Sequence, residues 1–157
     1  MPSRRKLIEL TADEVRDYLD AEKTLIIVGN GHNGYPHPMP MWFALDPDGT
    51  IRCTTFSKSQ KVLNWQRDPK ATLLVESGIE YADLKGVVIY ATCEIVDDPD
   101  EVRDTLVAIN SRGRDLDAGA KTKLREAVSG TAAKRVVLKF NPKRYVTWDH
   151  AKLGGRY

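Results

Sequence analysis

Hydrophobic and polar residues alternate along several segments of this chain, a pattern typical of β-strands with one buried face. The segment 86–96, GVVIYATCEIV, shows the alternation most clearly. Its apolar face carries Val87, Ile89, Ala91, Cys93 and Ile95. Similar runs, separated by turns such as 31–34, 46–49 and 141–143, predict the remaining strands over 24–30, 35–45, 50–56, 70–77, 134–140 and 144–148.

Helical patterns lie between or outside these strands. Thr11 and Glu14 have the spacing of a capping box and predict the start of the first helix. In a second, short helix we expect Ser57 as the N-cap, with Gln60 three residues later, and Pro69 marks its end. The four helices are predicted over 10–22, 57–68, 98–112 and 117–129.

Six or seven short strands with short connections favour an antiparallel sheet, whose edges must be closed or covered. A small barrel with peripheral helices satisfies that requirement. The predicted fold class is therefore mainly β (α+β). The 157 residues suffice for one domain with its own core, so we expect a single domain over 1–157.

The composition narrows the function classes. A net charge of +2, from 24 basic and 22 acidic residues, argues against nucleic acid, which requires a clustered basic surface. No apolar run approaches the roughly 18–20 residues that span a bilayer, and the N-terminus turns acidic too soon for a secretory signal. Cys53 and Cys93 lie in predicted strands and form no CxxC pair, so we expect buried thiols in a cytoplasmic protein.

Pro36, Pro38 and Pro40 recur at every second residue of the predicted strand 35–45. This spacing places all three missing N–H groups on one edge, which cannot pair with a neighbouring strand. One interpretation is an irregular edge strand. The other is an opening in the barrel beside Met41 and Trp42, where a flat ligand binds.

Two lysines, Lys58 and Lys61, lie near the start of the short helix, where the helix dipole disfavours cations. Helix N-termini bind anions, and lysines strengthen a phosphate site. Hydroxyl groups able to donate to phosphate oxygens surround them, on Thr54, Thr55, Ser57 and Ser59. The alternative is a solvated surface; the combination of lysines and hydroxyls favours the anion site.

Other candidate residues carry weaker signals. His32 and His37 flank the first hairpin, but no third metal ligand is evident, so surface histidines and no metal are expected. His150 titrates near neutral pH and is a candidate proton donor, and Tyr81 is a candidate lid over a bound ring. No Ser-His-Asp order or Gly-rich phosphate loop is present, which is compatible with chemistry supplied by a cofactor.

The segment 51–77, IRCTTFSKSQKVLNWQRDPKATLLVES, resembles the pyridoxamine 5′-phosphate oxidase-like split β-barrels, which include FMN-dependent and deazaflavin-dependent oxidoreductases. With the order of elements, the likeness covers about residues 14–157. The matching motifs are Thr54-Thr55, Ser59-Gln60-Lys61 and Asp68-Pro69. The resemblance implies that Lys61 binds a phosphate beside Ser59, whereas Lys58 has no firm counterpart. It also implies a homodimer, since the family carries a tryptophan like Trp148 near the dimer interface.

Three motifs depart from the true pyridoxamine phosphate oxidases. Gln60 replaces their arginine, the strand MPMWFAL lacks their Arg-x-x-x-x-Lys pattern, and Trp148-Asp149-His150 does not match their Arg-x-His motif. The resemblance therefore supports the fold and the cofactor class, and not vitamin B6 oxidation.

The sequence thus predicts a homodimeric split-barrel oxidoreductase that uses FMN or, alternatively, the 8-hydroxy-5-deazaflavin coenzyme on a small organic substrate. The lysines and hydroxyls are expected to hold the phosphate, and Pro40, Met41 and Trp42 the ring; no acid or base is assigned. Two alternatives remain: a non-catalytic flavin or tetrapyrrole storage protein, and a barrel for single-stranded nucleic acid, against which the near-neutral charge argues.

Overall fold

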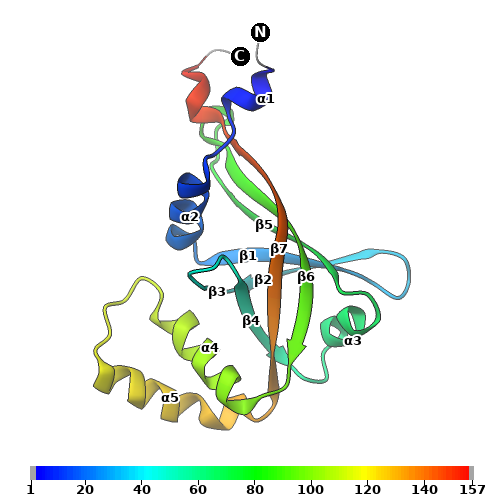
Figure 1. Ribbon diagram of the computed structural model, residues 1–157, viewed down its shortest axis with the longest axis vertical. Helices are drawn as coiled ribbons and strands as arrows, with labels where there is room; N and C mark the ends of the chain where they lie inside the picture. The colour runs from blue at the N-terminus through cyan, green and yellow to red at the C-terminus, as the bar shows by residue number, and fades with distance from the viewer. Residues whose placement is uncertain (1–2, 156–157) are drawn as a thin grey trace.

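The computed structural model describes residues 3–155. Figure 1 shows a strongly curved sheet with helices around it. The strands are β1 (Thr24–Asn30), β2 (Pro36–Trp42), β3 (Ala44–Leu45), β4 (Ile51–Phe56), β5 (Lys70–Ser77), β6 (Lys85–Val96) and β7 (Arg135–Asp149). The helices are α1 (Arg4–Leu7), α2 (Ala12–Ala21), α3 (Gln60–Arg67), α4 (Pro99–Ser111) and α5 (Ala118–Ala132), with 3-10 turns η1 (Tyr81–Asp83) and η2 (His150–Leu153).

The seven strands form one antiparallel sheet in the order β2-β1-β5-β6-β7-β4-β3. The sheet curls into a half-barrel, so the prediction of a mainly β, antiparallel fold with peripheral helices is confirmed. Alternate residues of each strand point into the curve, as strand geometry requires. The core there contains side chains with no exposed surface, such as Ile27, Leu73, Ile89 and Phe140.

The predicted turn at 141–143 is wrong, because β7 runs without a break from Arg135 to Asp149. Against β6, Ala91 pairs with Pro142 and Tyr90 pairs with Arg144, which leaves one extra residue in β7. This is a β-bulge, where a proline is tolerated because its missing N–H falls at a disrupted step of the ladder. The two strands predicted at this end of the chain are therefore one.

The helices lie on different parts of the sheet (Figure 1). The capping box predicted for α2 is confirmed: Thr11 Oγ1 accepts from the Glu14 N–H, and the Glu14 carboxylate accepts from the Thr11 N–H. α4 and α5 cover the outer face of β4 and β7 through a cluster that includes Val102 and Val137. No helix within residues 3–155 is long and apolar enough to cross a membrane.

Candidate functional site

The barrel is open between β2 and β4, and the prolines of β2 explain why. β3 pairs with β4 only through Ala44–Arg52 and Leu45–Ile51, and the Asp46 N–H donates to the Thr50 carbonyl in the adjoining turn. In β3, and in β2 that runs into it, the N–H groups of even-numbered residues therefore point toward β4. Residue 40 is even-numbered, but as a proline it has no N–H and cannot donate a hydrogen bond that would continue the β3–β4 ladder. β2 consequently remains an edge strand, paired on its other side with β1.

Continuing the β3–β4 register would set Met41 opposite Thr55 and Trp42 opposite Thr54. The strand predicted to hold a ring and the strand predicted to hold a phosphate thus lie on the two sides of this opening. Met41 is half-buried and packs against the core. Trp42 points the other way, is 51% exposed, and has the Lys23 ammonium 4.1 Å from its ring centre. Pro40 is exposed like Trp42.

The predicted hydroxyls do not all gather at one point. Thr55 points into the curve of the sheet, where its Oγ1 lies 3.3 Å from the Ser59 Oγ. Thr54, as the adjacent residue of the same strand, points to the opposite face. The structure therefore brings Thr55 and Ser59 together and leaves Thr54 on the other side of β4, while Ser57 is exposed in the turn that follows.

The predicted N-cap of the short helix is wrong. α3 begins at Gln60 with Ser59 as its N-cap, and Ser59 makes no side-chain capping bond. Ser57 instead donates its N–H to the Lys134 carbonyl, and the Ser59 N–H bonds to Phe56, closing a turn over 56–59. The helix starts two residues later than predicted because the backbone of residues 56–59 forms this turn and is not helical. Within the described part of the chain no side chain caps the first N–H groups of α3, which leaves them suited to an anion.

Lys61 is a half-buried cation on the first turn of α3. Burial lowers the pKa of its ammonium group. Across residues 3–155, neither Lys61 nor the exposed Lys58 has a carboxylate within ion-pair distance. A desolvated cation without a counter-charge is unfavourable unless a ligand supplies one, so this position fits a phosphate.

Sequence reasoning missed Arg135, at the start of β7 beside the end of β4. It pairs with Phe56 across the two strands, and its guanidinium lies 4.3 Å from the centre of that ring. One guanidinium nitrogen is 3.4 Å from the Thr54 Oγ1, a long contact, and the buried Nε has no hydrogen-bond partner among the residues that the structure describes. Only the pairing of β4 with β7 places this cation beside Phe56 and Thr54, and that pairing is not readable from local sequence.

Trp65 holds α3, and with it Lys61, against the barrel. Its side chain is 3% exposed, its indole N–H donates to the Lys70 carbonyl at 3.2 Å, and its ring meets Phe140 edge-on at 5.3 Å. A Cβ at Gly29 would lie 3.0 Å from this ring, so a side chain there would require the indole to shift by a few tenths of an ångström. The expectation that Trp65 is a core residue is confirmed.

Several other candidates lie at the end of the sheet beside α1 and η2 (Figure 1). Tyr81 is 60% exposed, and its ring contacts the His150 ring at a tilt of 55°, with 4.5 Å between ring centres. The His150 Nδ1 lies 2.7 Å from the Tyr81 carbonyl oxygen, so this histidine ties η2 to η1. Trp148 covers Gly86, where a Cβ would lie 2.3 Å from its ring.

Cys53 and Cys93 are buried free thiols, as predicted.

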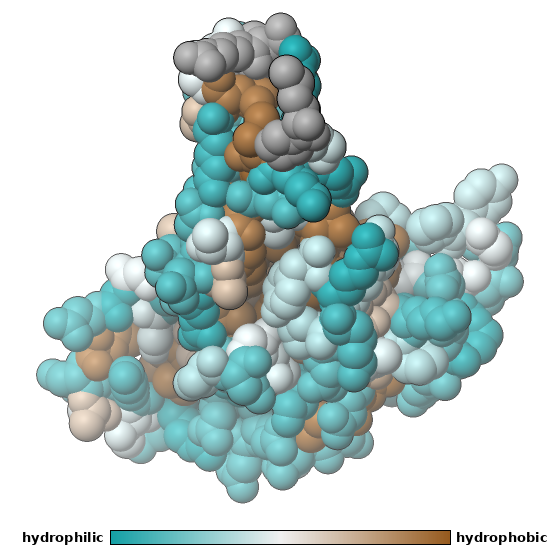
Figure 2. Space-filling view, turned by 45° about the horizontal axis from the view of Figure 1, so that its top comes forward, coloured by the Kyte–Doolittle hydropathy of each residue, from teal (hydrophilic) through white to brown (hydrophobic). Residues whose placement is uncertain are grey.

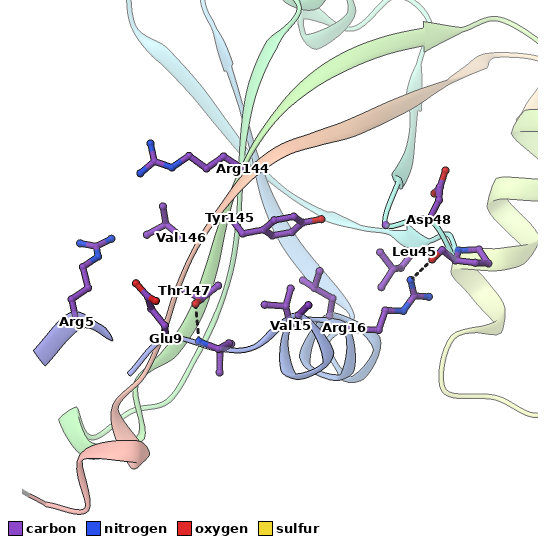
Figure 3. Close-up of a pocket in the computed structure, with 15 residues that line it drawn as sticks. Arg5, Glu9, Val15, Arg16, Leu45, Asp48, Arg144, Tyr145, Val146 and Thr147 are labelled. Carbon is purple, nitrogen blue, oxygen red and sulfur yellow. Dashed lines mark hydrogen bonds between the residues drawn. The ribbon is translucent and has the colours of Figure 1, made fainter. Parts of the chain in front are cut away.

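A separate cavity of about 600 Å³ lies between α2, the β3–β4 turn and β7 (Figure 3). None of the predicted site residues lines it. Its lining includes Val15, Arg16, Leu45, Arg144 and Tyr145. No sequence motif marked this cavity, because its walls come from three segments that are far apart in the chain.

Comparison with known proteins identifies the family. The family model for pyridoxamine 5′-phosphate oxidase matches residues 11–149. The crystal structure of a conserved hypothetical protein, Rv2991, from Mycobacterium tuberculosis is similar, with a TM-score of 0.87 and 31% identity over 99% of this chain and 94% of that one. A search of curated proteins gave no match.

Two more distant structures share the fold. One is an F420 reductase, with a TM-score of 0.61 and 22% identity over 83% of this chain and 94% of that one. The other is HutZ, a heme storage protein from Vibrio cholerae, with a TM-score of 0.64 and 13% identity over 89% and 97% of the two chains. The family match over most of the chain, together with the 31% identical structure, shows that this protein belongs to the pyridoxamine 5′-phosphate oxidase family of split β-barrels.

Proposed function

We propose that this protein is an oxidoreductase that binds a flavin-type cofactor, FMN or the 8-hydroxy-5-deazaflavin coenzyme, at the opening between β2 and β4. The observation that carries the proposal is Lys61, a half-buried cation on the first turn of α3. Among residues 3–155 it has no carboxylate partner, and no side chain of that range caps the N-terminus of the helix. A phosphate supplies the missing negative charge, and the first N–H groups of α3 supply hydrogen bonds.

The rest of the site follows from the placement of the two strands. Lys61, Ser59 and Thr55 hold the phosphate from the inner side of β4, and Lys58 adds an exposed positive charge. Thr54, on the outer face of β4, and Ser57, whose N–H donates to the Lys134 carbonyl, are not assigned to the phosphate. Pro40, Met41 and Trp42 hold the ring at the edge of β2, which has no neighbouring strand to compete for its polar groups.

The bound cofactor would accept or donate a hydride, and the protein's own residues bind and orient it. Two further observations support this cofactor class. The family is named for a phosphate-bearing redox substrate, and one structural neighbour is a reductase named for F420, the deazaflavin coenzyme. We assign no side chain as acid or base.

We also propose a homodimer. The outer face of β1, β5 and β6 carries half-buried apolar side chains, Ile26, Val28, Leu74 and Val88, although α4 and α5 cover the neighbouring outer face of β4. A second copy of the chain would cover this face. Sedimentation or light scattering that gives a monomer mass at micromolar concentration would contradict this part of the proposal.

A second candidate function is storage of a flavin or a tetrapyrrole without catalysis. The structural likeness to a heme storage protein favours it. The two functions differ in one measurable respect: a storage protein binds its ligand tightly without turning over against electron donors. An anaerobic assay that follows cofactor reduction and reoxidation with candidate acceptors separates them.

The test of the cofactor proposal is a fluorescence titration with FMN and with the deazaflavin coenzyme. We expect Lys61→Ala to weaken binding of the preferred cofactor at least about tenfold, or roughly 1.4 kcal/mol. Lys121→Ala, on the exposed face of α5, is the matched control and should leave the affinity unchanged. Equal affinity of the Lys61 variant and the wild type, or no binding of either cofactor, would overturn the proposal.

A further inference from the structure

Arg112 lies where α4 ends and the loop to α5 begins, and its side chain reaches α2. It is the C-cap residue of α4, and the turn that follows is closed by a bond from the Arg114 N–H to the Ser111 carbonyl. Figure 1 shows this loop beside the end of α2. Figure 2 shows many hydrophilic residues on the side of the molecule that carries α4 and α5, where charged groups remain in water. Arg112 is half-buried instead, so its charge requires compensating contacts.

The first of these contacts are with carbonyl groups at the C-terminus of α2. The Arg112 Nη2 donates to the Leu19 and Glu22 carbonyls at 2.5 Å and lies 3.1 Å from the Asp20 carbonyl. The last carbonyls of a helix have no partner within the helix, and a cation beside them also interacts favourably with the helix dipole. α2 has no basic residue in its own last turn. Arg112, which is at least 90 residues away in the chain, therefore caps α2.

The same guanidinium lies over the ring of Phe43. Its central carbon is 4.1 Å from the ring centre, and Phe43 has no exposed surface. A partly desolvated cation over an aromatic face is a favourable contact. Phe43 stands between the last residue of β2 and the first residue of β3. Arg112 consequently holds the chain at the point where it passes from β2 into β3.

The two sets of contacts meet at the strand ends that carry the proposed ring site. The end of α2 leads into β1, whose first residue, Thr24, pairs with Trp42, the last residue of β2. Lys23, just before β1, has its ammonium 4.1 Å from the centre of the Trp42 ring. On the other side, Phe43 follows Trp42 directly in the chain. Arg112 therefore holds Trp42 through both strands of the β1–β2 pair.

We propose that Arg112 is a positioning residue for the ring-binding part of the cofactor site. This role rests on the proposed cofactor function, and it assigns to that site a residue that no motif marks. Arg112 acts through Phe43 and the end of α2, which fix Trp42 at the edge of β2. The phosphate is held by a different element, since Lys61 lies on α3. Loss of Arg112 should therefore weaken the contribution of the ring to binding and leave the contribution of the phosphate unchanged.

FMN and riboflavin separate these two contributions, because they share the ring and the ribityl chain and differ by the phosphate. The ratio of their affinities thus measures the phosphate contribution. In fluorescence titrations of the full chain, we expect Arg112→Gln to weaken the binding of both ligands at least about tenfold and to leave the ratio unchanged. Lys61→Ala should instead reduce the ratio and leave the affinity for riboflavin unchanged. If the deazaflavin coenzyme is the cofactor that binds, the same comparison uses that coenzyme and its phosphate-free ring and ribityl portion.

Two controls distinguish positioning from a general loss of stability or charge. Thr11→Ala removes the capping box at the other end of α2 and leaves the contacts of Arg112 in place. It should change neither affinity at a temperature where every variant is folded. Arg114→Gln, at an exposed arginine two residues away, removes the same charge and should also change neither affinity. Where Arg112→Gln does not fold, Phe43→Leu takes its place, because it removes the ring under the guanidinium and retains the carbonyl bonds; the same direction of change is expected.

An unchanged affinity for riboflavin in Arg112→Gln, a loss confined to FMN, or an equal loss in Thr11→Ala would each overturn the role of Arg112. Failure of the cofactor proposal has a different signature. In that case the wild type binds no ligand, which overturns both proposals, or Lys61→Ala leaves the ratio unchanged, which overturns the phosphate site and not the role of Arg112.

Discussion

Replacing Trp65 by alanine tests how α3 is held in place, and with it the lysine on which the cofactor proposal rests. The indole is 3% exposed, so its removal leaves a cavity against Gly29 and Phe140. Truncation of a buried aromatic side chain destabilises a protein by about 3–5 kcal/mol. The edge-on contact with Phe140 (about 0.5–1.5 kcal/mol) and the bond to the Lys70 carbonyl (about 1 kcal/mol) fall within that loss.

The assay is urea unfolding followed by circular dichroism, because the substitution removes a fluorophore. In thermal unfolding of a chain of this size, the same loss of free energy lowers Tm by about 6–20 °C. Trp42→Ala is the matched control: that ring is 51% exposed and has one close cation, Lys23, so about 1 kcal/mol or less is expected. A loss below about 1 kcal/mol for Trp65→Ala would refute the view that this side chain anchors α3.

Three further predictions follow from the same structure. Thr11→Ala should lower the free energy of unfolding by about 1 kcal/mol, because it removes the capping box with Glu14; no change in the urea midpoint would contradict this. Burial raises the pKa of the Cys53 thiol and raises that of Cys93 to about 12. Iodoacetamide should therefore modify neither thiol in the native protein and both in urea, and mass spectrometry that finds native modification would refute the burial. Burial also lowers the pKa of Lys61, so FMN affinity should fall as the pH rises through that lowered value, while the affinity of Lys61→Ala should lack this component. Parallel pH profiles for the two proteins would contradict the assignment.

Features that depend on neighbouring residues could be predicted from the sequence. The capping box of α2 joins residues three apart, and the alternation along β6 is a property of one strand. The opening beside β2 was predictable for the same reason: prolines at every second residue remove the N–H donors from one edge of the strand, whatever lies elsewhere in the chain. Pro69 likewise ends α3, whose last residue is Arg67.

The errors arise where local signals compete or where contacts join distant segments. Ser57 and Ser59 are both plausible N-caps, and the turn closed by the Ser59 N–H decides between them. The sequence around Pro142 predicts a turn, but in the structure Pro142 lies at a β-bulge within the pairing of β7 with β6. Arg135 and the cavity beside α2 were not predictable, because each is assembled by pairing and packing between segments far apart in sequence.

The central claim is that a flavin-type cofactor binds at the opening between β2 and β4 with its phosphate on Lys61. A crystal structure of the protein with whichever cofactor binds more tightly tests this most directly. We predict the phosphate within hydrogen-bond distance of the Lys61 Nζ and the first N–H groups of α3, with the ring along Pro40, Met41 and Trp42. A cofactor found instead in the cavity between α2 and β7, or with its phosphate remote from Lys61, would contradict the account.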